Sequence, residues 1–297
     1  MLDLKNHFLK NLFRSMNACH IFEVLLALLT GATLTGGVIR CKGEDKEPWS
    51  YNGRRNAPRA WGKTYPECNN RMQSPINIQL ADVQKHPYLK HLEFKNYDES
   101  VRSAQVLNNG HSARITPNDG VVRTISVNND TYSLIQLHFH WGSRYNVGAE
   151  HLFNSKGYAM EAHFVHGNRH GHYAVVGVLY KESFFNNAGF NAISKELPQI
   201  KFKNETTQLR SPLNLTKLLP RLPLRFYRYN GSFTTPPCTE EVIWSVARDV
   251  VRIGSKQLEE LRSLFLVTRN EDRTGCHLVD NYRPVQPLNG RKVTAST

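Results

Sequence analysis

Four short segments rich in β-branched and aromatic residues are spaced along the chain and predict the strands of a sheet. They are residues 131–141, 158–166, 173–180 and 241–246, and turn signals made of Pro, Gly and Asn lie between them. Residues 173–180 are almost wholly apolar, which is typical of a strand covered on both faces. The pattern therefore predicts a mainly β fold of short strands connected by turns.

One segment has helical spacing instead. Ser255 is placed to cap a helix, and Leu258, Leu261 and Phe265 then fall along one face of it. Beyond residue 48 we find no linker or internal repeat that would divide a domain. We expect a single domain over residues 48–290 with a few peripheral helices, followed by a short polar tail at 291–297.

The start of the chain has the pattern of an export signal. An apolar run at residues 21–29 follows three basic residues, Lys5, Lys10 and Arg14, and precedes a stretch of small residues. This pattern predicts a cleaved secretory signal peptide over roughly residues 1–37, and hence a secreted, extracellular protein.

An uncleaved signal anchor is the alternative. Residues 21–39 are barely long enough to span a bilayer, and they include Glu23, so we expect cleavage and no stable membrane anchor. Met16 is an alternative start to Met1. The mature chain would then open with a polar leader at residues 38–47.

Composition describes an ordinary folded chain with a basic surface. Hydrophobic residues make up 40% of it, and 38 Lys+Arg against 25 Asp+Glu give a formal net charge of +13. The basic residues are scattered, and no zinc-finger or RNA-recognition signature occurs among them. We therefore expect no nucleic-acid partner; the charge favours anionic surroundings, such as an acidic extracellular matrix or mineral.

Two further patterns agree with export. Four Asn-X-Ser/Thr sequons are candidate glycosylation sites: Asn129, Asn204, Asn214 and Asn230. Cys19 falls in the signal, which leaves an even number of cysteines that could form disulfides in an oxidising compartment: Cys41, Cys68, Cys238 and Cys276. None of them has CxxC spacing, so a cysteine zinc site is not expected.

The sharpest chemical signal is a pair of histidines on one predicted strand. Side chains alternate along a strand, so Gln136, His138 and His140 point to one face and the apolar residues between them to the other. Glu161 and His163 repeat the pattern of acceptor and histidine on the next predicted strand. If the two strands are neighbours, three imidazoles converge while Gln136 and Glu161 accept their outer N–H groups. Three nitrogen ligands with an open fourth position are what a catalytic zinc site needs.

Half-buried histidines without a metal are the alternative, since the chain has 13 histidines. His170 and His172 also form an HxH pair, but a glycine lies between them and they lack a same-face acceptor, so we interpret them as a surface pair in a turn. His166 is three residues from His163 and is expected on the opposite face of the strand. These alternatives do not explain two strands that each carry an acceptor and a histidine.

Seven motifs follow one another between residues 48 and 290. They are QSPINI (73–78), NNGH (108–111), LHFHWG (137–142), EH (150–151), EAHFVH (161–166), SFTTPP (232–237) and DNYRP (280–284). Together they resemble the α-class carbonic anhydrases, and in particular the extracellular members of that family. The resemblance implies a large twisted, mostly antiparallel sheet, a Zn²⁺ cofactor, and the reversible hydration of carbon dioxide to bicarbonate and a proton. Anions and sulfonamide-type compounds are the inhibitors it implies.

The resemblance also implies a role for each matching residue. His138, His140 and His163 would hold the zinc. Thr234 would accept a hydrogen bond from zinc-bound hydroxide, pass its own proton to Glu150, and offer its backbone N–H to bicarbonate or an inhibitory anion, with Thr235 beside it at the pocket mouth. Zinc lowers the pKa of bound water to about 7, so a hydroxide nucleophile would be present near neutral pH.

The resemblance also implies residues for proton transfer and for substrate binding. His111 matches the proton shuttle, assisted through ordered water by Tyr51 and Asn109, and histidine is the residue whose ordinary pKa is closest to that of such a water. As a turn residue it would be able to swing toward solvent. An apolar wall for carbon dioxide is implied by five residues: Val165, Val175, Phe233, Val242 and Trp244.

Cys68 and Cys238 match the disulfide of the extracellular members, which would brace the loop that carries Thr234. Cys41 and Cys276 have no counterpart in the family: they could pair with each other, cross-link two chains, or remain free. The rival interpretations of function are a non-catalytic binding module of the same fold and a mineral-matrix protein.

Two departures from the family pattern predict a rate below that of the fastest members. Phe233 places a bulky ring where many fast members carry an aliphatic side chain. Arg114 lies three residues beyond His111 and should lower the pKa of that histidine if the two approach.

Overall fold

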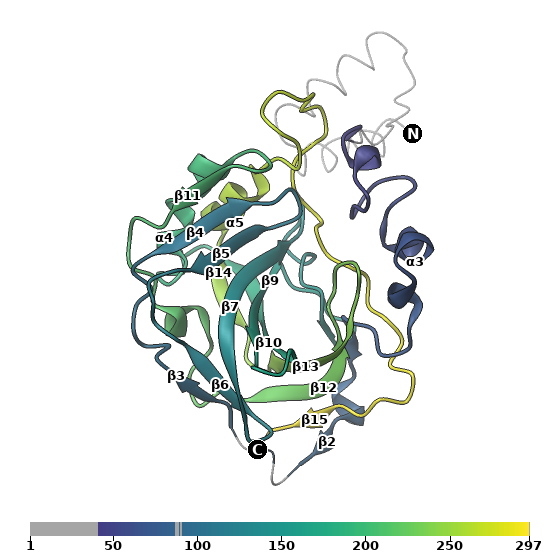
Figure 1. The fold of residues 1–297 in the computed structure, drawn as a ribbon, viewed down its shortest axis with the longest axis vertical. Coiled ribbons are helices and arrows are strands. Elements are labelled where there is room, and N and C mark those ends of the chain that lie inside the picture. The colour runs from purple at the N-terminus through teal and green to yellow at the C-terminus, as the bar shows by residue number, and fades with distance from the viewer. Residues whose placement is uncertain (1–40, 87–88, 90, 297) are drawn as a thin grey trace, which may run out of the picture. The chain divides into compact units, whose positions relative to one another are not determined.

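The computed structural model describes residues 41–86, 89 and 91–296, and its described part forms one compact unit around a large mixed sheet (Figure 1). The main path of the sheet runs through β11 (Thr206–Gln208), β4 (Ala104–Asn108), β5 (Ala113–Pro117), β7 (Asp130–Trp141), β9 (Met160–Gly167), β10 (Tyr173–Ser183), β13 (Glu240–Ala247), β12 (Phe226–Ser232), β15 (Thr294–Ala295) and β2 (Gln84–Lys85). Off this path, β14 (Val251–Gly254) pairs with β10, and β6 (Thr124–Val127) pairs with β7 and with β3 (Glu93–Lys95). Most neighbours are antiparallel, while β10–β13, β10–β14 and β15–β2 are parallel.

Smaller elements lie at the periphery. β1 (Asn77–Ile78) and β8 (Leu152–Phe153) form a separate two-stranded ladder. The helices are α3 (Trp61–Thr64), α4 (Asn191–Ser194) and α5 (Ser255–Arg262), with 3₁₀ turns at η1 (Glu44–Lys46), η2 (Pro58–Ala60), η3 (Pro66–Asn69), η4 (Leu80–Asp82), η5 (Leu197–Ile200) and η6 (Leu215–Leu218). The predicted mainly β fold with peripheral helices is therefore confirmed.

The four predicted strands correspond to β7, β9, β10 and β13, which are adjacent in the sheet. Every residue of β10 from Ala174 to Tyr180 is buried, as expected for an apolar strand covered on both faces. Alternation along β7 sends Leu137 and Phe139 into the larger apolar core. A second buried cluster contains Val165, Val175 and other residues of the site described below.

The predicted helix exists, but its boundaries differ from the prediction. α5 ends at Arg262, so Leu258 and Leu261 are buried on its inner face while Phe265 lies beyond it, in a β-bridge with His277. Gly254, not Ser255, occupies the cap position. The side chain of Gln257 accepts the Gly254 N–H, whereas the Ser255 hydroxyl donates to the Ser183 carbonyl. A glutamine side chain thus satisfies the free amide at the start of the helix.

Both ends of the described chain belong to the fold. The residues expected as a polar tail include β15, whose Thr294 and Ala295 pair with β12 and with β2, so the domain extends past residue 290. The predicted leader contains Cys41, which is buried and forms a disulfide with Cys276. The predicted signal peptide lies outside the described residues. None of the helices in the described part of the chain is long and apolar enough to cross a bilayer.

Two disulfides cross-link distant parts of the sequence. Cys68 pairs with Cys238, as the family resemblance implies. Cys41 pairs with Cys276, which selects the first of the three alternatives for these residues. Each bond closes a loop of well over a hundred residues, and the loss of such a bond typically costs a small domain about 2–5 kcal/mol of stability.

Candidate metal centre and active site

The register between β7 and β9 brings the three histidines of the sequence pattern together. The strands are antiparallel neighbours, with His138 directly opposite His163 and His140 opposite Glu161. The ring centroids are 5.0 Å apart for His138–His140, 5.1 Å for His138–His163 and 4.5 Å for His140–His163. One nitrogen from each ring lies within 4.8 Å of the others. Three imidazole nitrogens can therefore share one ion.

Each imidazole is oriented by an acceptor on its outer side. His138 Nδ1 lies 3.0 Å from Gln136 Oε1, His140 Nδ1 lies 2.7 Å from the Asn281 carbonyl, and His163 Nε2 lies 2.9 Å from Glu161 Oε1. Because these oxygens accept, the outer nitrogens carry the protons and the inner nitrogens keep their lone pairs.

The inner nitrogens then face one another without a proton between them. His140 Nε2 and His163 Nδ1 are 3.1 Å apart, a distance at which two lone pairs repel. Glu150 Oε2 lies 3.5 Å from the first and 3.9 Å from the second, and this buried oxygen has no hydrogen-bond partner within the described residues. A cation bound among these groups would remove the repulsion between the two lone pairs and would balance the charge of the Glu150 oxygen. The donor set thus fits a divalent metal ion, and three neutral nitrogens are typical ligands of catalytic zinc.

Burial keeps the three rings in the neutral form that metal binding requires. Desolvation lowers the pKa of His140 to about 3, and the neighbouring His163 adds to the effect. Desolvation likewise lowers the pKa of His163 and holds that of His138 well below its usual value, helped for His138 by His140.

A network behind the ligands includes residues to which the sequence analysis assigned no role. Burial alone would raise the pKa of Glu161, but His151 and His163 hold it well below its usual value. Glu161 Oε1 contacts His151 Nδ1 at 2.7 Å, and Oε2 accepts the amides of Glu150 and His151. His151 Nε2 in turn lies 2.7 Å from the Tyr229 hydroxyl. His151 belongs to a motif quoted above and could have been suspected, whereas the backbone carbonyl of Asn281 leaves no signature in a sequence.

Glu150 and Thr234 lie beside the three histidines. Burial raises the pKa of Glu150 well above its usual value, and the effect is partly offset by the hydrogen bond from the Arg283 amide and by the nearby Thr234 hydroxyl. The Arg283 amide donates to Glu150 Oε1 at 2.7 Å. A dication held by the imidazoles would also lower this pKa and favour the carboxylate.

The loop that carries Thr234 is tightly closed. The Phe233 amide donates to the Thr239 carbonyl at 2.9 Å, and the Cys238 amide donates to the Thr235 carbonyl at 2.9 Å. The Cys68–Cys238 disulfide fastens the end of this turn. Thr234 is buried, and Thr235 beside it is half-buried.

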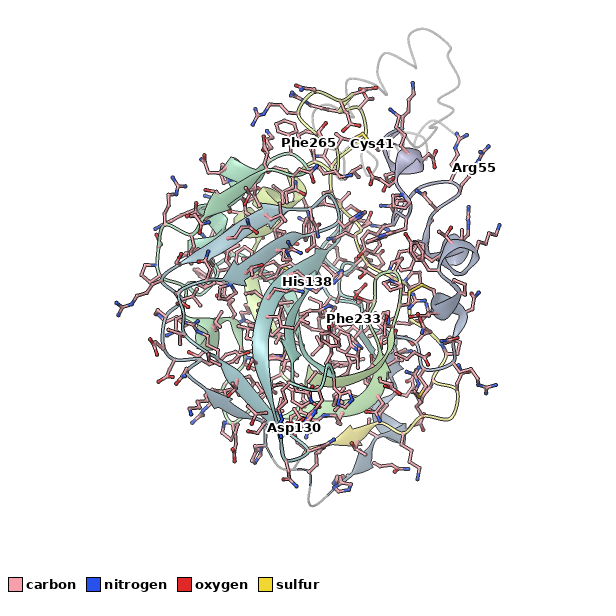
Figure 2. The ribbon with its side chains drawn as sticks, in the orientation of Figure 1. Cys41, Arg55, Asp130, His138, Phe233 and Phe265 are labelled. Atoms are coloured by element: carbon pink, nitrogen blue, oxygen red, sulfur yellow. A yellow bond between two sulfur atoms is a disulfide. The ribbon has the colours of Figure 1, made fainter. Side chains whose placement is uncertain are left out.

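An apolar cluster adjoins the metal ligands. Val165, Val175, Val242 and Trp244 belong to it, and Phe233 packs against it. Trp244 meets His163 edge-on at 4.8 Å, and Phe233 meets Tyr173 in the same way at 5.0 Å. Figure 2 shows His138 and Phe233 within the central region of the molecule that the curved sheet surrounds. The five residues expected to form the apolar wall are therefore brought into one cluster.

His111 is held more firmly than a free turn residue would be. Its ring stacks on Trp49 at 3.8 Å with an interplanar angle of 14°, and Tyr51 meets it edge-on at 6.4 Å. Asn109 Oδ1 accepts the His111 amide at 2.9 Å, so this side chain shapes the turn itself. Burial, and secondarily the Lys203 ammonium, lower the pKa of His111 to about 4.

The cation beside His111 is thus Lys203 and not the expected Arg114. Arg114 lies on β5 directly opposite His138 on β7. There it helps to lower the pKa of that metal-ligand candidate. The expected depression of the His111 pKa is present, but it has a different cause.

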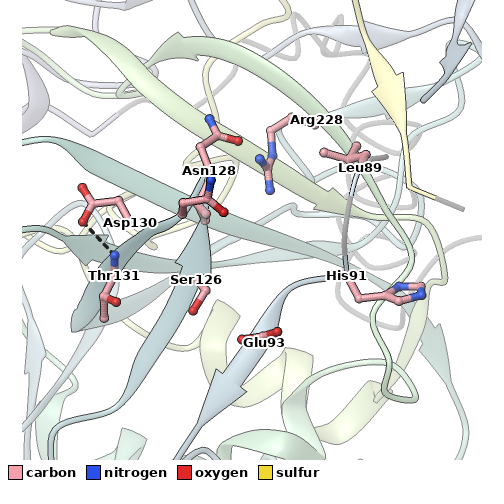
Figure 3. Close-up of a pocket in the computed structure, with 10 residues that line it drawn as sticks. Leu89, His91, Glu93, Ser126, Asn128, Asp130, Thr131 and Arg228 are labelled. Atoms are coloured by element: carbon pink, nitrogen blue, oxygen red, sulfur yellow. Dashed lines mark hydrogen bonds between the residues drawn. The ribbon is translucent and has the colours of Figure 1, made fainter. Parts of the chain in front are cut away.

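The remaining histidine motif and a large polar pocket lie apart from this centre. His170 and His172 are exposed in the turn between β9 and β10, and His166 is buried with its Nε2 beside the Tyr97 hydroxyl, as expected. A pocket of about 550 Å³ borders β3, β6 and the turn before β7, with polar side chains such as Glu93, Asp130 and Arg228 on its walls (Figure 3). The metal-ligand candidates among the described residues do not line this pocket.

Comparison with known proteins agrees with this geometry. Residues 56–297 match the eukaryotic-type carbonic anhydrase family. The chain is 37% identical to mouse carbonic anhydrase 7 over 84% of its own length and 97% of that protein. It is also 35% identical to mouse carbonic anhydrase 15, over 84% of the chain and 83% of the relative, and 33% identical to human carbonic anhydrase 12, over 84% and 73%. The chain therefore belongs to the eukaryotic-type carbonic anhydrase family.

Proposed function

We propose that this protein is an active, zinc-dependent carbonic anhydrase that interconverts carbon dioxide and bicarbonate. The observation that carries the proposal is the convergence of three neutral imidazole nitrogens, from His138, His140 and His163, next to Glu150 and the apolar cluster. A Zn²⁺ ion in this position would supply Lewis acidity and a water acidic enough to ionise near neutral pH.

Thr234 and Glu150 would orient the nucleophile. The Thr234 hydroxyl, which lies near Glu150, would donate to the Glu150 carboxylate, so its oxygen would be left to accept a hydrogen bond from an oxygen nucleophile. Arg283 supports this direction of donation because its amide holds Glu150 in place. The backbone N–H of Thr234 would receive bicarbonate or an inhibitory anion.

The apolar cluster would hold carbon dioxide beside the nucleophile. Val165, Val175, Val242 and Trp244 present no buried charge to this small apolar molecule, and the cluster reaches His163 through Trp244. His111 would take the proton that the reaction leaves behind and pass it to buffer. Tyr51 and Asn109 stand near that histidine as its supports.

The decisive experiment is stopped-flow hydration of carbon dioxide by the purified protein. We expect clear activity in the wild type, its loss on removal of metal with a chelator, and its return on addition of Zn²⁺. His163→Ala should reduce hydration to the uncatalysed background, because two imidazoles cannot hold the ion as three do. A protein that contains one zinc ion yet hydrates no carbon dioxide would be a binding module or a matrix protein of the same fold, and the proposal would be abandoned.

The acceptors behind the ligands should set zinc affinity. Gln136→Ala removes the group that fixes the His138 ring, and we expect zinc binding about 10–100-fold weaker in a chelator competition assay. His170→Ala, at an exposed histidine on the turn after β9, is the matched control and should bind zinc like the wild type. Equal affinities for the Gln136 variant and the wild type would contradict the assignment.

Phe233 should limit turnover by narrowing the space beside Thr234. Phe233→Leu is expected to raise kcat/KM severalfold for carbon dioxide, and to lose about 0.5–1.5 kcal/mol of stability with the edge-on contact to Tyr173. Phe184→Leu, at a ring that is 90% exposed, controls for loss of an aromatic side chain. The steric argument fails if turnover of the Phe233 variant does not rise.

We also infer that the protein is secreted and glycosylated. Two disulfides favour an oxidising compartment. Asn129 and Asn204 are exposed, and Asn129 lines the polar pocket bordered by β3 and β6. Asn214 is occupied by hydrogen bonds to Thr216 and to the Asp98 carbonyl, and Asn230 is exposed on β12.

Expression in a secreting eukaryotic cell tests this inference. We expect the protein in the medium, and a fall in its apparent mass when N-glycans are removed enzymatically. Asn129→Gln and Asn204→Gln should each remove part of that fall, whereas Asn214→Gln should not. Retention of all the protein inside the cell, without glycans, would contradict the inference.

A further inference from the structure

The segment from Cys41 to Cys68, here called the strap, is fastened at both ends. Cys41 is joined to Cys276 and Cys68 to Cys238, and all four cysteines are buried. The second bond holds the loop of Thr234, as described above. The Cys41–Cys276 bond is not part of the metal centre, and the contacts of the strap show what it holds in place.

Between the disulfides the strap is folded onto itself. Asn56 Nδ2 donates to the carbonyls of Glu44 and Glu47 at 2.6 and 2.8 Å. The Ser50 amide donates to the Asn56 carbonyl at 2.9 Å, and Trp61 Nε1 donates to the Ser50 carbonyl at 3.0 Å. These bonds make residues 44–61 one unit, so its position depends on how the unit is fastened.

This unit covers His111. Trp49 stacks on the imidazole, and it is itself held edge-on by Tyr51 at 5.5 Å and by Trp61 at 5.3 Å. An aromatic ring packed face to face over an imidazole removes one whole side of it from water. His111 is consequently half-buried although it belongs to a turn.

Lys203 packs against the turn that carries His111. Its side chain forms an ion pair with Glu47 of the strap, and its aliphatic part packs so closely against Gly110 that a Cβ there would lie 2.7 Å from Lys203 Cδ. The Lys203 amide donates to the Val267 carbonyl, and Val267 packs against Gly43 beside the Cys41 sulfur. A continuous series of contacts therefore connects the Cys41–Cys276 bond with the surroundings of His111.

The remaining space around His111 is small. A cavity of about 10 Å³, enough for about one water, lies between the strap and the turn. The titratable and charged groups that face this space are Glu44, Glu47, Tyr51 and Lys203. Burial is the main cause that holds the pKa of His111 near 4, Lys203 lowers it further, and Glu47 raises it.

We propose that the strap restrains His111, with Trp49 and Lys203 as positioning residues and the Cys41–Cys276 disulfide as the fastening, so that proton transfer is slower than the metal centre alone would allow. A buried, stacked imidazole accepts a proton reluctantly and cannot turn toward solvent to release it. The inference rests on the proposed function, in which His111 is the proton shuttle.

The first test does not depend on catalysis. In Cys41→Ser/Cys276→Ser, which keeps Cys68–Cys238, the His111 ring should titrate at a pKa about one unit or more above that of the wild type, moving toward the ordinary value of about 6.5. The measurement is an NMR titration of ¹³C-labelled histidine, with the His111 signal assigned from His111→Ala. An unchanged His111 pKa would overturn the proposal.

The second test separates proton transfer from the chemistry at carbon. Regeneration of the nucleophile follows bicarbonate release, so it affects kcat and not kcat/KM. At low buffer concentration the Cys41→Ser/Cys276→Ser variant should show a severalfold higher kcat for hydration than the wild type, with unchanged kcat/KM. Added imidazole buffer should reduce this difference in kcat. A fall of kcat and kcat/KM together would mean that the bond supports the metal centre instead, and would also overturn the proposal.

Trp49→Ala provides a second variant in case the double cysteine variant does not fold. It keeps both disulfides, removes the stacked ring, and should raise the His111 pKa in the same direction. Asp249→Asn breaks an exposed ion pair with Arg225 and should change neither the pKa nor kcat. If the wild type proves inactive while both strap variants still raise the His111 pKa, the restraint stands and the proposed function falls.

Discussion

Two antiparallel strands, β7 and β9, pair in a register that sets His138 against His163 and His140 against Glu161, and the rest of the site is arranged around that pairing. A slip of one residue would turn the imidazoles of one strand into the apolar core and send Phe139 or Phe164 toward the metal position. The alternation of buried aromatic and ligand side chains therefore fixes the register and the ligand geometry at the same time. The core packing of Leu137, Phe139 and Phe164 is part of what aims the histidines.

Two buried carboxylates beside this pairing have opposite electrostatic environments. Glu161 accepts two backbone amides and contacts His151 and His163, so it is held as an anion although it is fully buried. Glu150 has one oxygen bonded to the Arg283 amide and the other without a hydrogen-bond partner in the described part of the chain, and its pKa is raised. Environments that push the pKa values of two carboxyl groups apart give them different chemical roles. Glu161 orients a ligand, while Glu150 remains able to respond to a cation and to Thr234.

Sequence patterns predicted the parts of this molecule that follow strand periodicity. The strands β7, β9, β10 and β13, the common face of His138 and His140, and the opposite face of His166 all follow from alternation. Features that depend on contacts between distant segments were missed or misplaced: the carbonyl of Asn281 behind His140, the stacking of Trp49 on His111, and the placement of β15 between β12 and β2. The cap of α5 was misplaced because Gln257, three residues after Gly254, accepts the Gly254 amide, while the Ser255 hydroxyl donates to the carbonyl of the distant Ser183.

The division between strands and loops also explains where the disulfides lie. The metal ligands stand on β7 and β9, whose ladder of backbone hydrogen bonds holds them without covalent help. Thr234 and His111 stand on loops, which lack such a ladder and are intrinsically less constrained. Each of these loops adjoins one cross-link: Cys68–Cys238 ends the turn of Thr234, and Cys41–Cys276 fastens the strap that covers His111. A disulfide thus constrains each loop, as strand pairing constrains the metal ligands. At His111, the Cys41–Cys276 bond that holds the strap in place also limits the access of this histidine to solvent.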